Sequence, residues 1–148
     1  MTTTTLTRTI IIKAAPETVF RAMTDWSRQN EWMVGTTVTA GQHDGQGVAA
    51  TIAARTALGP FGFTDPMTIT EWQPPYRCAV QHTGQIVRGS GLFLVEASTE
   101  ASRFTWSEVI ELPFGWFGRF GWTLVKPFAG FGLSWSLRRF KRWTEQRS

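Results

Sequence analysis

Residues 68–83 read T-I-T-E-W-Q-P-P-Y-R-C-A-V-Q-H-T, and this stretch decides the fold. Apolar and polar residues alternate on both sides of Pro74 and Pro75, which is typical of two β-strands that meet at a corner. Neither proline can donate a hydrogen bond to a sheet ladder, so the chain must turn there. The stretch therefore predicts an antiparallel strand pair within a longer run of strands.

Similar segments on both sides of this pair predict the rest of the sheet. The seven predicted strands cover residues 6–13, 36–40, 47–57, 67–73, 76–83, 86–97 and 103–112. Loops rich in glycine, proline and polar residues separate them, among them residues 41–47 and 58–66. Such an arrangement predicts a curved antiparallel sheet.

Two short helices are predicted after the first strand. Pro16 suits the first position of a helix, and Glu17 is favourable near the positive end of its dipole. Val19, Phe20 and Met23 recur at helical spacing and form an apolar face. A second helix is predicted over residues 26–33, with Asp25 as its cap.

A long C-terminal helix is predicted to begin at Pro127 and to extend for about 27 Å. It carries two apolar stripes. The first contains Phe128, Phe131 and Trp135 and continues into Arg138, Arg139 and Arg142, and the second contains Leu133, Leu137 and Phe140. A helix that is apolar on two sides is buried from both sides or meets a partner.

Length and composition predict one cytoplasmic domain that spans residues 1–148. The single cysteine, Cys78, cannot form a disulfide within the chain, and the N-terminal residues lack the pattern of a secretory signal. Eight tryptophans and eleven phenylalanines against one tyrosine supply aromatic surface almost without hydroxyl groups. Such surface suits apolar packing or an apolar ligand.

The net charge of +4 is unevenly distributed. Residues 119–148 contain seven bases and one acid, a local charge of +6, whereas the first 118 residues contain eight bases and ten acids, a charge of −2. Because the body is mildly acidic and no groove-reading motif is present, nucleic acid is not predicted as a partner.

Four segments carry a family resemblance: A-P-E-T-V-F-R-A-M-T-D-W at 15–26, followed by Trp32, then I-T-E-W-Q-P-P-Y-R at 69–77, G-S-G-L-F-L-V-E at 89–96 and S-R-F-T-W-S-E at 102–108. Their order and spacing resemble the polyketide cyclase/dehydrase and lipid-transport family of the START-like (SRPBCC, helix-grip) superfamily. The resemblance implies an α+β helix-grip fold, in which a curved seven-stranded antiparallel sheet wraps around a long C-terminal helix and a hydrophobic cavity lies between the sheet and the helix. It implies little about activity, because the fold hosts carriers, receptors and aromatase/cyclases.

Strand alternation gives the first candidate catalytic residue. In the strand over 103–112, Phe104, Trp106 and Ile110 mark the apolar face, and Glu108 has the same parity. A carboxylate facing inward must be paired, hydrogen-bonded or protonated. Glu108 is therefore a candidate acid or base, the structural alternative being an edge residue that reaches water or pairs with an arginine.

The strand predicted over 76–83 gives the second candidate, because Tyr76, Cys78, Val80 and His82 share one face. An imidazole facing a cavity can act as acid or base or orient a carbonyl, or it can simply be satisfied at the strand end. Arg88 could bind a ligand carboxylate, but pairing with Glu108 is the preferred expectation.

Other chemistry finds little support in the sequence. The residues His43, Cys78, His82 and the acids have no metal-binding spacing, and G-Q-H-D-G-Q-G at 41–47 lacks the lysine and the setting of a phosphate loop, so no metal and no cofactor are predicted. The aromatic and glycine-rich segment 114–122 is predicted to pack under the last helix, with a lid or a membrane contact as alternatives.

Binding of a small hydrophobic ligand by a carrier or sensor is the favoured function, and transient contact of the basic C-terminal segment with a membrane surface accompanies it. Two alternatives stay open: a cyclase/dehydrase-type enzyme with Glu108 or His82 as base and Arg88 or Tyr76 as donor, and a homodimer formed through the second stripe of the last helix. The predicted ligand-binding residues are Tyr76, Val80, Arg88, Phe93, Phe104, Trp106, Phe128, Phe131 and Trp135.

Overall fold

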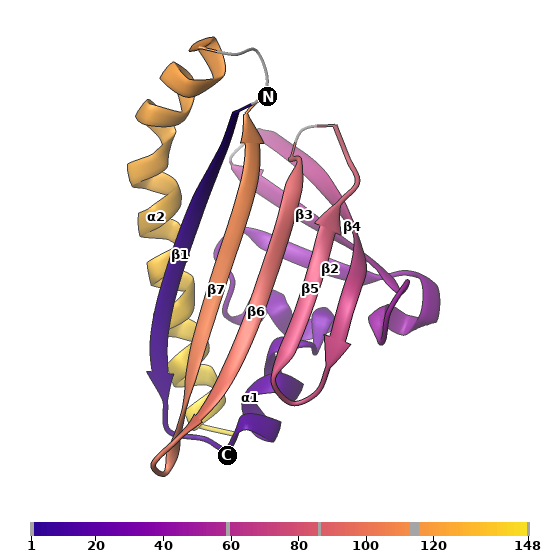
Figure 1. Cartoon of the computed structure of the whole chain (residues 1–148), viewed down its shortest axis with the longest axis vertical. Coiled ribbons are helices and arrows are strands. Elements are labelled where there is room, and N and C mark those ends of the chain that lie inside the picture. The colour runs from indigo at the N-terminus through magenta and orange to yellow at the C-terminus, as the bar shows by residue number, and fades with distance from the viewer. Residues whose placement is uncertain (1, 59, 86, 113–115, 148) are drawn as a thin grey trace.

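The computed structural model describes residues 2–58, 60–85, 87–112 and 116–147 (Figure 1). Its elements are β1 (Thr2–Ile12), α1 (Pro16–Met23), η1 (Trp26–Glu31), β2 (Thr36–Ala40), η2 (Gln42–Gly45), β3 (Thr51–Leu58), β4 (Phe61–Gln73), β5 (Arg77–His82), β6 (Gly89–Ser98), β7 (Ala101–Leu112) and α2 (Trp116–Glu145). The elements η1 and η2 are 3-10 helices.

All seven strands form one antiparallel sheet in the order β1-β7-β6-β5-β4-β3-β2. The strand β1 pairs with β7 along its whole length, and α2 runs beside β1 (Figure 1). Both α1 and η1 follow β1, as expected. The prediction of a helix-grip fold with a seven-stranded sheet is confirmed.

The corner that decides the fold lies where it was predicted. Pro74 and Pro75 connect β4 to β5, and the turn is closed by the Tyr76 amide, which donates to the Gln73 carbonyl at 2.8 Å. The register between the two strands shifts by one residue between Ile69 and Glu71, which marks a β-bulge. The pair then stays in register to Gln73 and Arg77.

Two predicted boundaries are wrong by more than four residues. The stretch 58–66 was expected to be a loop because it is rich in glycine and proline, but β4 begins at Phe61 and pairs with β3 along this stretch. The last helix begins at Trp116, and Pro127 lies inside it. Of the aromatic segment 114–122, residues 116–122 are thus helical, whereas its first two residues and the packing predicted for its side chains lie outside the description.

The core lies between the inner face of the sheet, α1, η1 and the buried side of α2. Trp32 is fully buried at its centre, with ring centroids 4.5 Å from Phe140 and 6.3 Å from Trp106. The second stripe of α2, Leu133, Leu137 and Phe140, is buried in this core. A homodimer through that stripe is therefore wrong, because these side chains already pack within the chain.

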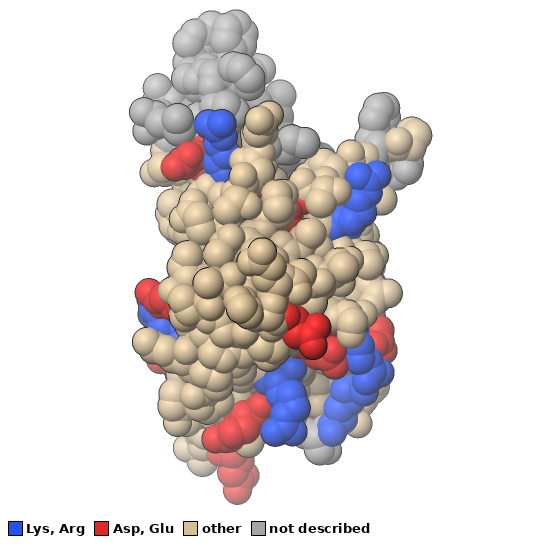
Figure 2. All heavy atoms as spheres, turned by 90° about the vertical axis from the view of Figure 1, so that its right-hand side faces the viewer, with Lys and Arg blue, Asp and Glu red and all other residues tan. Residues whose placement is uncertain are grey.

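The surface seen in Figure 2 has a wide area without charged side chains, and where charges gather, blue and red lie close together. This face does not form the continuous basic surface typical of nucleic-acid binding. Among the described residues, no helix combines the length and the apolar character needed to cross a bilayer.

Candidate functional site

A cavity of about 170 Å³ lies between the inner face of the sheet and η1. Every strand except β1 contributes to its wall, because alternate side chains of a strand point to the same face. Its lining residues are Trp26, Gln29, Met33, Thr36, Ile52, Ala54, Thr56, Asp65, Met67, Val80, His82, Phe93, Trp106 and Glu108. Most of these are apolar, and three are titratable.

The three titratable residues form one hydrogen-bonded cluster. His82 Nδ1 lies 2.9 Å from Asp65 Oδ2 and 3.0 Å from Oδ1, and His82 Nε2 lies 2.9 Å from Glu108 Oε2. The side chains of His82, Asp65 and Glu108 are only 4%, 11% and 17% exposed. The cluster is thus a buried carboxylate, imidazole and carboxylate in series.

The order of the strands explains how these residues meet. Asp65 is on β4 and His82 on the adjacent β5, but Glu108 is on β7, with β6 between. The residue of β6 opposite Glu108 is Gly91, and a Cβ atom there would lie 2.9 Å from Glu108 Oε1. Because Gly91 has no side chain, the carboxylate can reach across β6 to His82.

The protonation of the cluster follows from its hydrogen bonds. An ionised carboxylate only accepts, so each of the two contacts between nitrogen and carboxylate needs one proton. Burial disfavours the charged imidazolium, but hydrogen bonds to Asp65 and Glu108, together with their negative charges, outweigh it and raise the pKa of His82 to about 9. His82 is therefore an imidazolium at neutral pH, held between two carboxylates.

Trp106 fixes the other side of the Glu108 carboxylate. Its Nε1 donates to Glu108 Oε1 at 2.8 Å, and its ring lies 5.3 Å from that of Phe93. Both Glu108 oxygens are thus engaged, which sets the direction of the carboxylate. Such a cluster can hold a proton at a defined place and orient the polar end of a molecule in the cavity.

Five of the predicted site residues line the cavity: Val80, His82, Phe93, Trp106 and Glu108. The predicted pairing of Glu108 with Arg88 is wrong, because Arg88 is exposed and the carboxylate bonds to His82 and Trp106. Tyr76 is also outside the cavity and is 51% exposed, since it lies in the turn before β5.

Phe104 and two of the three predicted residues of α2 are placed elsewhere too. Phe131 and Trp135 are 65% and 49% exposed, because their stripe faces solvent rather than the sheet. Phe104 is fully buried and packs against Phe93 and Phe140, but it is not among the lining residues. The side chain of Phe128 lies outside the description.

Sequence reasoning missed Asp65 and Gly91. Asp65 lies in the stretch that composition predicts to be a loop, although the alternation of Ile69 and Met67, extended backwards, places it on the inner face. Gly91 carried no signal of its own, because its role depends on the register between β6 and β7.

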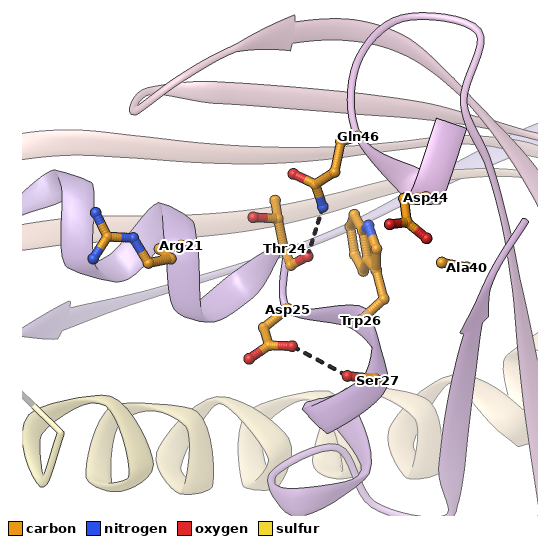
Figure 3. Close-up of a pocket in the computed structure, with 8 residues that line it drawn as sticks. All are labelled: Arg21, Thr24, Asp25, Trp26, Ser27, Ala40, Asp44 and Gln46. Carbon is orange, nitrogen blue, oxygen red and sulfur yellow. Dashed lines mark hydrogen bonds between the residues drawn. The ribbon is translucent and has the colours of Figure 1, made fainter. Parts of the chain in front are cut away.

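A second, open cleft of about 370 Å³ lies outside the cavity (Figure 3). Trp26 borders both hollows, and it is itself almost fully buried. Its Nε1 donates to the Gly45 carbonyl at 2.7 Å, and Gln46 donates to the Thr24 carbonyl at 3.3 Å beside it. The bond to Gly45 thus holds the indole that lies between cleft and cavity, and the bond from Gln46 ties the chain after η2 to the end of α1.

Metal binding finds no support in the described ranges, where no group of three histidine, cysteine or acidic residues is arranged to hold an ion. The expectation of no metal and no cofactor stays a prediction.

A family model described as polyketide cyclase / dehydrase and lipid transport matches residues 3–144. No curated protein matches the sequence. Among solved structures, the chain is similar to TTHA0849 of Thermus thermophilus, at 16% identity and TM-score 0.83, covering 98% of this chain and 99% of that one. It is also similar to the Zhui aromatase/cyclase of Streptomyces sp. R1128, at 12% identity and TM-score 0.80, covering 99% and 96%.

A third similar structure is the Aha1 dimer of Colwellia psychrerythraea, at 17% identity and TM-score 0.69, covering 96% of both chains. At these identities the solved structures show a shared fold and nothing more. The family model covers nearly the whole sequence, and the fold it implies is the one described above. The chain belongs to the polyketide cyclase/dehydrase and lipid transport family.

Proposed function

We propose that the chain binds a small hydrophobic, ring-containing molecule in the cavity under the sheet, as a carrier or sensor. The observation that carries the proposal is a cavity with mostly apolar walls and one buried polar cluster. Apolar burial supplies affinity in such a site, and a few polar groups fix the orientation of the ligand. A volume of about 170 Å³ suits one ring, since an apolar cavity of about 150 Å³ holds benzene.

Native mass spectrometry of the protein purified from cells, followed by denaturing extraction, tests this function. We expect a co-purified apolar molecule or, in an empty protein, uptake of single-ring compounds in NMR titrations. An empty protein that takes up no such compound would remove the cavity as a binding site. The predicted cytoplasmic location is not needed for this test.

A second candidate function, proton-transfer catalysis on a carbonyl compound, is favoured by the cluster of Asp65, His82 and Glu108. Of the two bases expected from sequence, Glu108 would take a proton next to the carbonyl, because His82 is already protonated and holds Glu108 in place, and a donor would stabilise the charge that develops on oxygen. The donors expected from sequence, Tyr76 and Arg88, are exposed outside the cavity, which weakens this candidate. Glu108→Gln and His82→Asn should each abolish turnover while ligand binding persists; full turnover in both would exclude the mechanism.

A carrier must also reach the place from which it takes its ligand. The outer face of α2 supports contact with an anionic lipid surface. Phe131 and Trp135 are exposed there with ring centroids 5.8 Å apart, and Arg138 and Arg142 are exposed one to three turns further along. Aromatic and basic side chains on one helix face suit the interface of an anionic membrane.

Sedimentation with vesicles that contain phosphatidylserine tests the contact. We expect binding at low ionic strength that salt weakens, and that the double variant Phe131→Ser, Trp135→Ser loses. Tyr76→Ser is the matched control, because Tyr76 is an exposed aromatic residue away from α2. If the protein stays in the supernatant at low salt, the membrane contact is wrong, and the carrier function must work without it.

A further inference from the structure

The polar end of the cavity contains side-chain donors that are already engaged and acceptors that are not saturated. His82 uses both ring nitrogens on Asp65 and Glu108, and Trp106 donates its only N–H to Glu108. Trp26 donates its N–H away from the cavity, to the Gly45 carbonyl. None of these groups has a hydrogen left to offer a ligand.

Among the remaining polar lining residues, only the Gln29 amide has a hydrogen left over. It donates one of its two N–H hydrogens to the Met23 carbonyl at 3.3 Å. The hydroxyls of Thr36 and Thr56 bond to one another at 3.2 Å, and Thr36 also donates to the Val34 carbonyl. A buried donor without a partner does exist in Trp32 Nε1, but Trp32 is not among the lining residues.

Acceptor capacity is left over. A carboxylate has about four lone-pair sites on its two oxygens. Glu108 accepts two hydrogen bonds, one from His82 and one from Trp106. Asp65 accepts only one, from a single imidazole N–H that lies near both of its oxygens. The two protons counted above leave the cluster with a net charge of −1. Among the lining residues that the structure describes there is no lysine or arginine to balance it.

Aromatic rings form much of the wall beside this charge. Trp26, Phe93 and Trp106 all line the cavity. The face of an aromatic ring attracts cations, and tryptophan does so most strongly. A ligand with a positive, hydrogen-donating end would thus meet both acceptors and ring faces.

We propose that the cavity takes a small aromatic amine, a single ring that carries an aliphatic ammonium group, with the ammonium donating to Glu108 and Asp65. This inference rests on the proposed ligand-binding function and names its ligand class. The same donors and acceptors disfavour a fatty acid or another carboxylate, because its anionic end would face two carboxylates and only the second N–H of Gln29 would be free to donate to it.

Three probes of similar size separate the alternatives: benzylamine, benzyl alcohol and benzoate, each titrated into the full chain at pH 7 with NMR as the readout. We expect benzylamine, which is protonated at this pH, to bind on the order of ten-fold more tightly than benzyl alcohol, since charge-assisted hydrogen bonds are about twice as strong as neutral ones. Benzoate should not bind measurably.

Two variants locate the effect. Glu108→Gln removes one negative charge from the cavity and should bring the dissociation constants of benzylamine and benzyl alcohol within about two-fold of each other. Glu111→Gln is the matched control, because it removes one negative charge from the outer face of the same strand, and it should keep the ten-fold preference. Should Glu108→Gln fail to fold, Asp65→Asn tests the second acceptor in the same way.

The possible results test the amine proposal separately from the proposed ligand-binding function. If the unmodified chain binds benzyl alcohol or benzoate as tightly as benzylamine, or more tightly, the amine proposal is wrong but the ligand-binding function stands. A preference that survives both cavity variants also overturns it. If none of the three probes binds, the proposed cavity function fails, and the inference fails with it.

Discussion

His82 links the charge of the cavity to the stability of the fold. Its pKa rises from about 6.5 in the unfolded chain to about 9 in the folded one, so folding favours the protonated form. The resulting stabilisation, about 3 kcal/mol, is fully present below pH 6.5 and is lost as the pH rises through 9. We expect NMR titration to give an imidazole midpoint near 9, and urea unfolding to show declining stability over that range. A midpoint near the ordinary value of about 6.5 would contradict the charged cluster.

Gly91 should control the position of Glu108 without changing any charge. In Gly91→Ala the new Cβ would lie 2.9 Å from Glu108 Oε1 and 3.1 Å from Oε2, so the carboxylate must move away from His82. Because the obstructed atoms end a flexible side chain, we expect a stability loss of at most about 1.5 kcal/mol but a clear fall in the pKa of His82. Gly132→Ala is the control, since its Cβ meets nothing within 4 Å; an unchanged His82 titration in Gly91→Ala would show that β6 is not the constraint.

Residues on regular strands were the part of the site that sequence could predict. Alternation alone placed Glu108, His82 and Trp106 on the inner face, because a strand has only two faces. It could not show that Glu108 meets His82 rather than Arg88, because that contact depends on the strand order and on a glycine in the strand between them. Partners across a sheet follow from register, which single-strand patterns do not contain.

At the scale of elements, the segment from η2 to the start of β3 is strained, and it borders the cleft on the other side of Trp26 from the cavity. His43, Asp44 and Ala49 have φ of 56°, 57° and 72°, in the left-handed region that costs non-glycine residues energy. Gly45, with φ of 69°, accepts the Trp26 hydrogen bond from within this loop. Strain of this kind persists where surrounding contacts fix the backbone, and here the buried indole supplies such a contact.

Gly45→Ala should therefore be destabilising for two reasons. Its Cβ would lie 2.6 Å from Trp26 Cδ1, and its φ disfavours any side chain, so we expect a loss of about 2 to 4 kcal/mol in urea unfolding. Gly47→Ala separates the two causes, because φ there is 96° but no atom lies within 4 Å, and it should cost only about 1 kcal/mol. Equal losses in both variants would show that the contact with Trp26 contributes nothing.

Element boundaries failed where local composition disagreed with tertiary structure. Glycine and proline in residues 58–66 suggest a loop, but pairing with β3 makes this stretch a strand. Pro127 suggests a helix start, yet α2 begins well before it, at Trp116, and continues through it. Elements whose residues all agree with one structure, such as α1 with Pro16 at its start, were predicted well.

At the scale of the whole molecule, the sheet and η1 enclose a space that either holds a ligand or is a packing defect, and filling it separates the two. Ala54 lines the cavity, so Ala54→Phe should occupy part of its 170 Å³. If the cavity binds a ligand, this variant loses uptake of benzylamine in NMR titrations and any co-purified molecule. Its stability should fall by no more than about 3 kcal/mol, because the new ring enters existing space.

Ala53→Phe is the matched control, because the neighbouring residue points to the outer face of β3 and does not line the cavity. It adds the same ring to the same strand and should bind benzylamine like the unmodified chain. Uptake that persists in Ala54→Phe would place the bound molecule elsewhere, and the cleft bordered by Arg21, Asp25 and Asp44 on the other side of Trp26 would be the next site to fill. Because Trp26 is the shared wall, the comparison also shows on which side of that indole the molecule binds.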